Sequence, residues 1–123
     1  MRGLWIGVAG FAGAVCRYWL DGVVSRVTGG GFPWGTWVVN VSGCLLIGVL
    51  ATVLNERLMP HPALRLSVTI GFVGAYTTFS TFAYETVRLA QDGAVGIALV
   101  NVVASVVTGV VACWVGILVG RAL

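Results

Sequence analysis

Charged side chains are scarce in this sequence, and lysine is missing from it altogether. Its 123 residues include seven arginines and four acidic residues, so charged residues make up 9% of the chain and hydrophobic residues 59%. Soluble domains carry about 25% charged residues, because their surface has to interact with water. The composition therefore excludes a soluble domain and predicts an integral membrane protein, with the lipid bilayer as its surroundings. The net charge of +3 is small and scattered, so we expect no nucleic-acid partner.

Residues that enzymes use for catalysis are also few. The single histidine, His61, lies between two prolines in a polar connector, and neither a Ser/His/Asp or Cys/His set nor a glycine-rich phosphate loop is present. The three cysteines, Cys16, Cys44 and Cys113, fall in different apolar segments without metal-binding spacing, so we expect free thiols that pack as small hydrophobic residues. We therefore expect that the protein is not an enzyme.

Four apolar segments are each long enough to cross a bilayer, which takes about 20 residues in a helix. Connectors rich in glycine, proline and polar residues separate them. Only helices and closed barrels satisfy the backbone in lipid, and these segments are too long to be barrel strands. The sequence therefore predicts an all-α integral membrane protein. Its single membrane domain is predicted to hold four transmembrane helices, at residues 3–24, 34–54, 63–89 and 94–119.

The arginines give almost no signal for orientation in the membrane. Four of them lie on the side of the termini and the second connector, and three lie on the opposite side. Two interpretations remain: other features outweigh a weak signal, or the chain inserts both ways and its subunits pair antiparallel. Four helices leave little room for an aqueous path enclosed by a single subunit. A transport function therefore favours an oligomer, most simply a two-fold dimer.

Several polar side chains lie deep within the predicted spans. Asn40 is about two turns into the second span, and Asn101, Ser105 and Thr108 form a stripe along one face of the fourth. They can bond neighbouring helices or line a pathway. Their number, together with the hydroxyl-rich centre of the third span, favours a pathway. Amides and hydroxyls donate hydrogen bonds, as phenyl ring edges do weakly, and no carboxylate lies near a span centre, so this pathway suits a small anion.

The acidic residues bear on the alternatives. Asp21 and Glu85 lie toward the ends of their spans, where Arg17 and Arg88 are four and three residues away, so we expect local ion pairs. A small multidrug exporter depends on a glutamate within its first helix, and the first span here has none. A non-transporting scaffold protein, the other alternative, needs no polar stripe.

The third span is interrupted by the run GAYTTFSTF at residues 74–82. Gly71 and Gly74 weaken a helix, which predicts half-helices at 63–70 and 79–89 with an unwound middle. The alternative is an intact helix whose hydroxyls bond back to the preceding turn. Unwound backbone at this depth is tolerated only inside protein or beside water, where its carbonyls bind cations and its amides bind anions.

Three motifs of this chain resemble those of the Fluc (CrcB) fluoride channels. They are GAVCRY at 13–18, GTWVVNVSG at 35–43 and GFVGAYTTFSTF at 71–82, and the similarity extends in order over the whole chain. The resemblance implies four transmembrane helices with a broken third helix, in an antiparallel, dual-topology homodimer. It further implies two fluoride pores per dimer, a structural sodium ion (Na+) at the dimer centre, and passive efflux of fluoride across the inner membrane.

The resemblance also assigns roles to particular residues. The sodium ion would be held by the backbone carbonyls of Gly74 and Thr77. Gly109 stands where the family often has a second hydroxyl in its fourth helix, so either Thr108 takes its place or the polar track is shorter here. The implied fluoride-pore residues are Asn40, Phe79, Phe82 and Ser105, the further pore candidates are Thr78, Ser80, Asn101 and Thr108, and Arg17 has a structural or vestibule role.

Overall fold

A computed structural model describes residues 1–58 and 61–123, and every regular element within these ranges is helical. Four helical segments are long and apolar enough to cross a membrane, in agreement with the predicted spans: Arg2–Thr28, Trp34–Leu58, Pro62–Gln91 and Val95–Ala122. Pro60, in the predicted connector beside His61, lies outside the described residues. The elements in chain order are α1 (Arg2–Thr28), α2 (Trp34–Thr52), the π-helix η1 (Val53–Leu58), α3 (Pro62–Leu66), the π-helix η2 (Ser67–Val73), α4 (Gly74–Tyr76), α5 (Phe79–Gln91) and α6 (Val95–Ala122).

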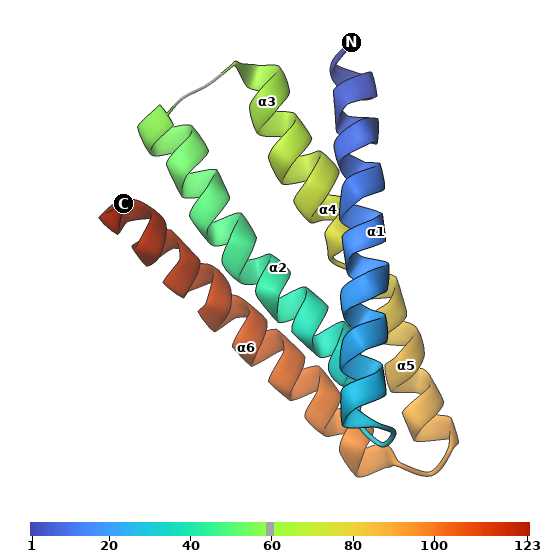
Figure 1. Cartoon of the computed structure of the whole chain (residues 1–123). Coiled ribbons are helices and arrows are strands. Elements are labelled where there is room, and N and C mark those ends of the chain that lie inside the picture. The colour runs from blue at the N-terminus through green and yellow to red at the C-terminus, as the bar shows by residue number, and fades with distance from the viewer. Residues whose placement is uncertain (59–60) are drawn as a thin grey trace.

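The four segments run alternately down and up, so that both termini lie toward the upper end of the view (Figure 1). The most extensive interface joins α2 to α6. Glycines allow this close approach: a Cβ atom on Gly48 would lie 2.3 Å from the carbonyl oxygen of Cys113, and one on Gly116 would lie 2.4 Å from that of Leu45. Small residues bring backbones together in this way in membrane helices.

The first helix packs on the third segment, mainly against η2 and α4. Here too glycines set the distance, because a Cβ on Gly13 would lie 2.2 Å from the carbonyl oxygen of Phe72 and one on Gly71 2.7 Å from that of Ile6. Arg17 adds a polar contact, its Nε donating to the carbonyl of Ala75 at 3.2 Å. The first helix therefore supports the backbone just before residue 77.

The prediction that Asp21 and Glu85 form local ion pairs is wrong. Asp21 accepts a hydrogen bond from the Ser25 hydroxyl at 3.3 Å, whereas Arg17 turns to the third segment. Glu85 forms no ion pair with Arg88, and its Oε1 is buried without a partner among the described residues. Tertiary packing, which sequence spacing does not contain, directs these side chains elsewhere.

The third segment departs from helical geometry over two residues. Thr77 has φ −84° and ψ 158°, and Thr78 has φ −148° and ψ 114°, so both are extended between α4 and α5. We call these two residues the extended step. The prediction that the first half-helix ends at residue 70 is wrong, because helical structure continues to Tyr76. Gly71 lies within η2 and serves the close approach to α1, so it does not unwind the chain there.

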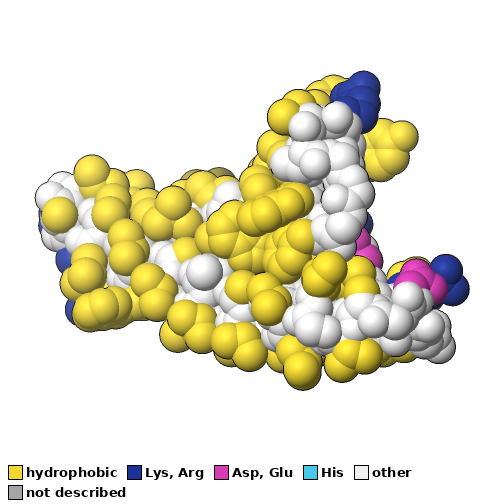
Figure 2. Space-filling model, turned by 90° about the horizontal axis from the view of Figure 1, so that it is seen from below, with side chains coloured by type: hydrophobic (Ala, Val, Ile, Leu, Met, Phe, Trp, Pro, Cys, Tyr) yellow, Lys and Arg dark blue, Asp and Glu magenta, His cyan; other side chains and the backbone are white. Residues whose placement is uncertain are grey.

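Hydrophobic side chains cover the outside of the bundle. Figure 2 shows them over most of one face, with the charged side chains visible there at its margins. On α6, Leu99 and Val110 are 62% and 66% exposed. A membrane protein presents such a surface to lipid.

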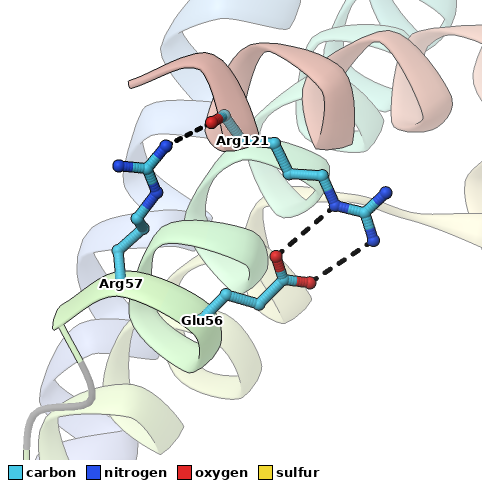
Figure 3. Close-up of polar contacts among 3 residues, drawn as sticks. All are labelled: Glu56, Arg57 and Arg121. Carbon is cyan, nitrogen blue, oxygen red and sulfur yellow. Dashed lines mark hydrogen bonds and ion pairs between the residues drawn. The ribbon is translucent and has the colours of Figure 1, made fainter.

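One ion pair joins the end of η1 to the end of α6, and it is the only salt bridge in the described ranges. Arg121 Nε lies 3.4 Å from Glu56 Oε2, and Arg57 donates to the carbonyl of Arg121 (Figure 3). Both charged partners are at least half exposed, so the pair contributes only about 0–1 kcal/mol to stability.

Candidate functional site: an uncharged cleft beside the extended step

A cleft of about 370 Å³ opens between α2, the third segment and α6. No charged side chain is among its lining residues. Its polar groups are an amide, hydroxyls and backbone, set among apolar side chains. The lining residues are Asn40, Gly43, Cys44, Ile47, Thr69, Val73, Gly74, Thr77, Thr78, Phe79, Phe82, Ser105 and Val106.

Asn40 holds the extended step through both ends of its amide. Its Nδ2 donates to the carbonyl of Thr78 at 2.9 Å, and its Oδ1 accepts from the Thr78 amide at 2.7 Å. A buried backbone amide requires an acceptor, and the Thr78 amide has lost its helical one, the carbonyl of Gly74. One further amide proton and one lone pair of Asn40 remain for a ligand in the cleft.

Thr78 starts the next helix as its N-cap. Its Oγ1 accepts from the Thr81 amide at 3.2 Å, which is the usual capping contact. The first turn of α5 therefore begins at the cleft. The amide groups in such a first turn have no intrahelical acceptor and carry a partial positive charge.

The extended step leaves several carbonyls without their helical donors, and those of Gly74 and Thr77 are two of them. In a continuous helix the Thr78 amide would bond the Gly74 carbonyl, but it donates to Asn40 instead. Likewise the Thr81 amide would bond the Thr77 carbonyl, but it donates to the Thr78 hydroxyl. The carbonyls of Gly74 and Thr77 are thus among the acceptors that the step releases, and both residues line the cleft.

The two phenylalanines lie on the cleft side of α5. Their ring centroids are 5.6 Å apart, and the ring planes are inclined at 50°. Phe79 is 78% exposed and Phe82 is partly buried. Both residues line the cleft, and the edge of a phenyl ring is the positive part of its quadrupole.

The polar stripe of α6 is divided between two roles. Ser105 lines the cleft. Asn101 is 1% exposed and donates to the Thr86 hydroxyl at 2.9 Å, while Thr108 accepts from the Trp37 indole at 3.1 Å and donates to the carbonyl of Ala104. In the structure Asn101 and Thr108 therefore bond neighbouring groups, as the alternative interpretation of the stripe expected.

Comparison with known proteins places the chain in a family. The family described as "CrcB-like protein, Camphor Resistance (CrcB)" matches residues 4–117. The chain belongs to the CrcB family. A relative from Citrifermentans bemidjiense is 48% identical over 120 residues, covering 98% of this chain and 97% of its own length. One from Acidobacterium capsulatum is 45% identical over 121 residues, with coverage of 98% and 97%. One from Geobacter sulfurreducens is 47% identical over 118 residues, with coverage of 96% and 95%.

All three relatives are named fluoride-specific ion channel FluC. This CrcB family member is thus a multi-pass membrane protein of an ion-channel family, and the family is not one of enzymes. The membership also confirms the resemblance on which the site assignments depend. It leaves neither the multidrug exporter nor the scaffold protein as an alternative.

The remaining predicted residues of this CrcB family member lie beside the cleft. Ser80 is exposed on α5, with its hydroxyl 3.4 Å from that of Thr78. Arg17 is partly buried behind the extended step, bonded to Ala75. Neither residue is among those that line the cleft, and Arg17 contacts the backbone of the third segment.

Some cleft residues were not predicted from the sequence. Gly43 lies three residues after Asn40 on the same face of α2, a spacing that could have pointed to it. Its hydrogen atom faces the extended step, since a Cβ there would lie 2.2 Å from Cγ2 of Thr77. Thr69 reaches the cleft from η2, and no periodic signal marks a residue in a π-helical segment.

Proposed function

We propose that this protein is a fluoride-specific channel that allows passive efflux of fluoride across the inner membrane. The observation that carries the proposal is the uncharged cleft, which gathers the amide of Asn40, the hydroxyl of Ser105 and the two phenylalanine rings. Conduction requires sites that attract an ion without trapping it. Donors and ring edges supply moderate attraction for an anion, and a full positive charge would hold it. The names of the relatives supply the identity of the ion.

We propose further that the extended step is the break of the third transmembrane helix and that a second subunit covers it. The carbonyls of Gly74 and Thr77 have lost their helical donors beside an open cleft. Irregular backbone does not face lipid at membrane depth, because each unsatisfied group costs several kcal/mol there. A second copy of the chain can cover this backbone and complete the path beside Phe79. The even distribution of arginines favours an antiparallel homodimer of dual topology, with two pores.

A structural sodium ion at the dimer centre fits the residues present. The carbonyl oxygens of Gly74 and Thr77 are among those that the step releases, and uncharged oxygens suit a monovalent cation. Two subunits related by a two-fold axis would bring four such carbonyls together. The ion would supply a positive charge at the interface. Asn40 and Arg17 would keep the carbonyls in place, since they hold the backbone on either side of Tyr76.

The flux experiment uses liposomes that contain the purified protein and are loaded with fluoride or chloride. Ion-selective electrodes measure efflux after addition of a potassium ionophore, which lets potassium leave with the anion and so prevents a membrane potential from opposing the efflux. We expect rapid loss of fluoride and retention of chloride. Glu56→Gln is the matched control that should leave flux unchanged, because Glu56 is remote from the cleft lining. Retention of fluoride by folded protein would contradict the proposed function.

A further inference from the structure

A buried asparagine connects two cleft residues of different helices. Asn101 is 1% exposed, and its Oδ1 accepts from the Ser105 hydroxyl at 3.2 Å while its Nδ2 donates to the Thr86 hydroxyl at 2.9 Å. Thr86 in turn donates to the carbonyl of Phe82 at 2.8 Å. A directed chain of hydrogen bonds thus runs from Ser105 on α6 to Phe82 on α5, and both of these residues line the cleft.

The direction of this chain determines what Ser105 presents to the cleft. A serine hydroxyl has one proton, and here that proton points to Asn101. The groups left for the cleft are the lone pairs of the oxygen, which repel an anion. In this arrangement Ser105 is an acceptor, although an anion needs a donor.

Reversal of the Asn101 amide changes Ser105 into a donor. With nitrogen and oxygen exchanged, the amide donates to the Ser105 oxygen and accepts from the Thr86 hydroxyl, and the two ends of an amide are nearly equal in size. The Ser105 proton is then free to bond an anion in the cleft. Only the bond from the Thr86 hydroxyl to the Phe82 carbonyl is lost, and that carbonyl keeps its helical partner, the Thr86 amide. The new bond to the anion replaces the one given up.

We propose that Asn101 is a positioning residue whose amide reverses when an anion lies beside Ser105, so that Ser105 becomes a hydrogen-bond donor to the anion. The proposal rests on the proposed function. Asn101 itself does not touch the anion, since it is buried behind Ser105 and absent from the cleft lining. Thr86 takes part because its hydroxyl can both accept from and donate to the amide.

Side-chain amide signals in nuclear magnetic resonance test the reversal. The chain has only three asparagines, Asn40, Asn55 and Asn101, so ¹⁵N-asparagine labelling of the protein in detergent micelles gives three pairs of side-chain signals. Asn101→Leu identifies the pair from residue 101. We expect sodium fluoride to shift that pair and equal sodium chloride to leave it in place. In Ser105→Ala, fluoride should still shift the Asn40 signals but no longer those of Asn101.

Substitutions at Thr86 test the same proposal by flux. Reversal of the Asn101 amide breaks the bond from the Thr86 hydroxyl to the Phe82 carbonyl, and Thr86→Val lacks that bond from the start. Reversal then costs one hydrogen bond less, so we expect the half-saturating fluoride concentration to fall about threefold, the factor typical of one membrane hydrogen bond. Thr86→Ser keeps the hydroxyl and should match the unchanged protein. A merely structural role for Thr86 would instead lower maximal flux or raise the half-saturating concentration.

The outcomes separate this inference from the proposed function. If the unchanged protein passes no fluoride, the proposed function fails. If it conducts fluoride, the inference alone is overturned by Asn101 signals that ignore fluoride, by signals that still shift in Ser105→Ala, or by a higher half-saturating concentration in Thr86→Val. Size-exclusion chromatography and circular dichroism establish that each variant is folded before it is measured.

Discussion

Replacement of Asn40 by aspartate changes one atom at the point where the extended step is held. Asn40 now donates to the Thr78 carbonyl at 2.9 Å and accepts from the Thr78 amide at 2.7 Å. Ionised aspartate accepts but cannot donate, so one carboxylate oxygen would face the Thr78 carbonyl at hydrogen-bonding distance. Loss of this buried hydrogen bond, with a carboxylate oxygen in the place of its donor, costs about 1–3 kcal/mol. At about 1.4 kcal/mol per factor of ten, the held conformation would become roughly 5- to 150-fold less populated.

The negative charge adds to this effect, because it lies in the proposed path of an anion. We therefore expect Asn40→Asp to reduce fluoride flux at neutral pH at least about tenfold. Protonation of the carboxyl restores an O–H donor toward the Thr78 carbonyl and removes the charge. Flux through Asn40→Asp should consequently rise as the pH falls, whereas flux through the unchanged protein should not follow this trend.

The assay is fluoride efflux from liposomes at a series of pH values, expressed per amount of folded protein. Liposomes without protein measure the leak of the protonated acid through lipid at each pH. Asn40→Leu is the matched control, since leucine has a similar size and cannot recover a donor at any pH. Normal flux through Asn40→Asp at neutral pH, or a loss that acid does not reverse, would refute the reasoning.

Four further predictions concern the rings, the step, the topology and the cation. Phe79→Ile and Phe82→Ile should each reduce fluoride flux while the dimer persists on size-exclusion chromatography, because aliphatic groups lack a positive ring edge; normal flux in both would remove that role. Gly43→Ala should destabilise the protein and reduce flux, because the new Cβ would lie 2.2 Å from Thr77 Cγ2, and Thr77→Ser should rescue it in the double variant by removing that methyl group. Cysteine-reactive probes applied from either side of intact vesicles should label tags in both sets of loops, and labelling from one side only would exclude dual topology. Exchange of sodium for N-methylglucamine during prolonged dialysis should reduce flux, and full flux after complete exchange would exclude a required sodium ion.

The number of membrane spans could be predicted because hydropathy is a local property summed over about 20 residues. The position of the site could also be predicted in part. Polar residues are costly in a bilayer, so Asn40, Ser105 and the threonines of the third segment stood out against their apolar surroundings. The structure brings Asn40, Phe79, Phe82 and Ser105 to one cleft, although they come from three separate segments.

The division of the polar stripe could not be predicted. Asn101 and Ser105 are one helical turn apart and share a face, yet Asn101 is buried against Thr86 and Ser105 opens to the cleft. The rotation and tilt of α6 against α5 determine this difference. These quantities depend on packing between helices and cannot be predicted from the sequence periodicity of a single helix.

The extent of the extended step has the same kind of cause. Helix propensity marked Gly71 and Gly74 as weak points, and the helix nevertheless continues through both of them to Tyr76. Gly71 lies where α1 packs against the third segment, and the lack of a side chain allows this close approach. The chain leaves the helix at Thr77 and Thr78, where Asn40 from α2 accepts from the Thr78 amide, which has lost its helical acceptor, and donates to the Thr78 carbonyl. Composition and hydropathy thus established a four-helix membrane protein with polar groups at depth, because the cost of placing a residue in lipid depends on that residue alone. The cleft, its partners and the exact step depend on contacts between segments far apart in the chain, and only folding brings these together.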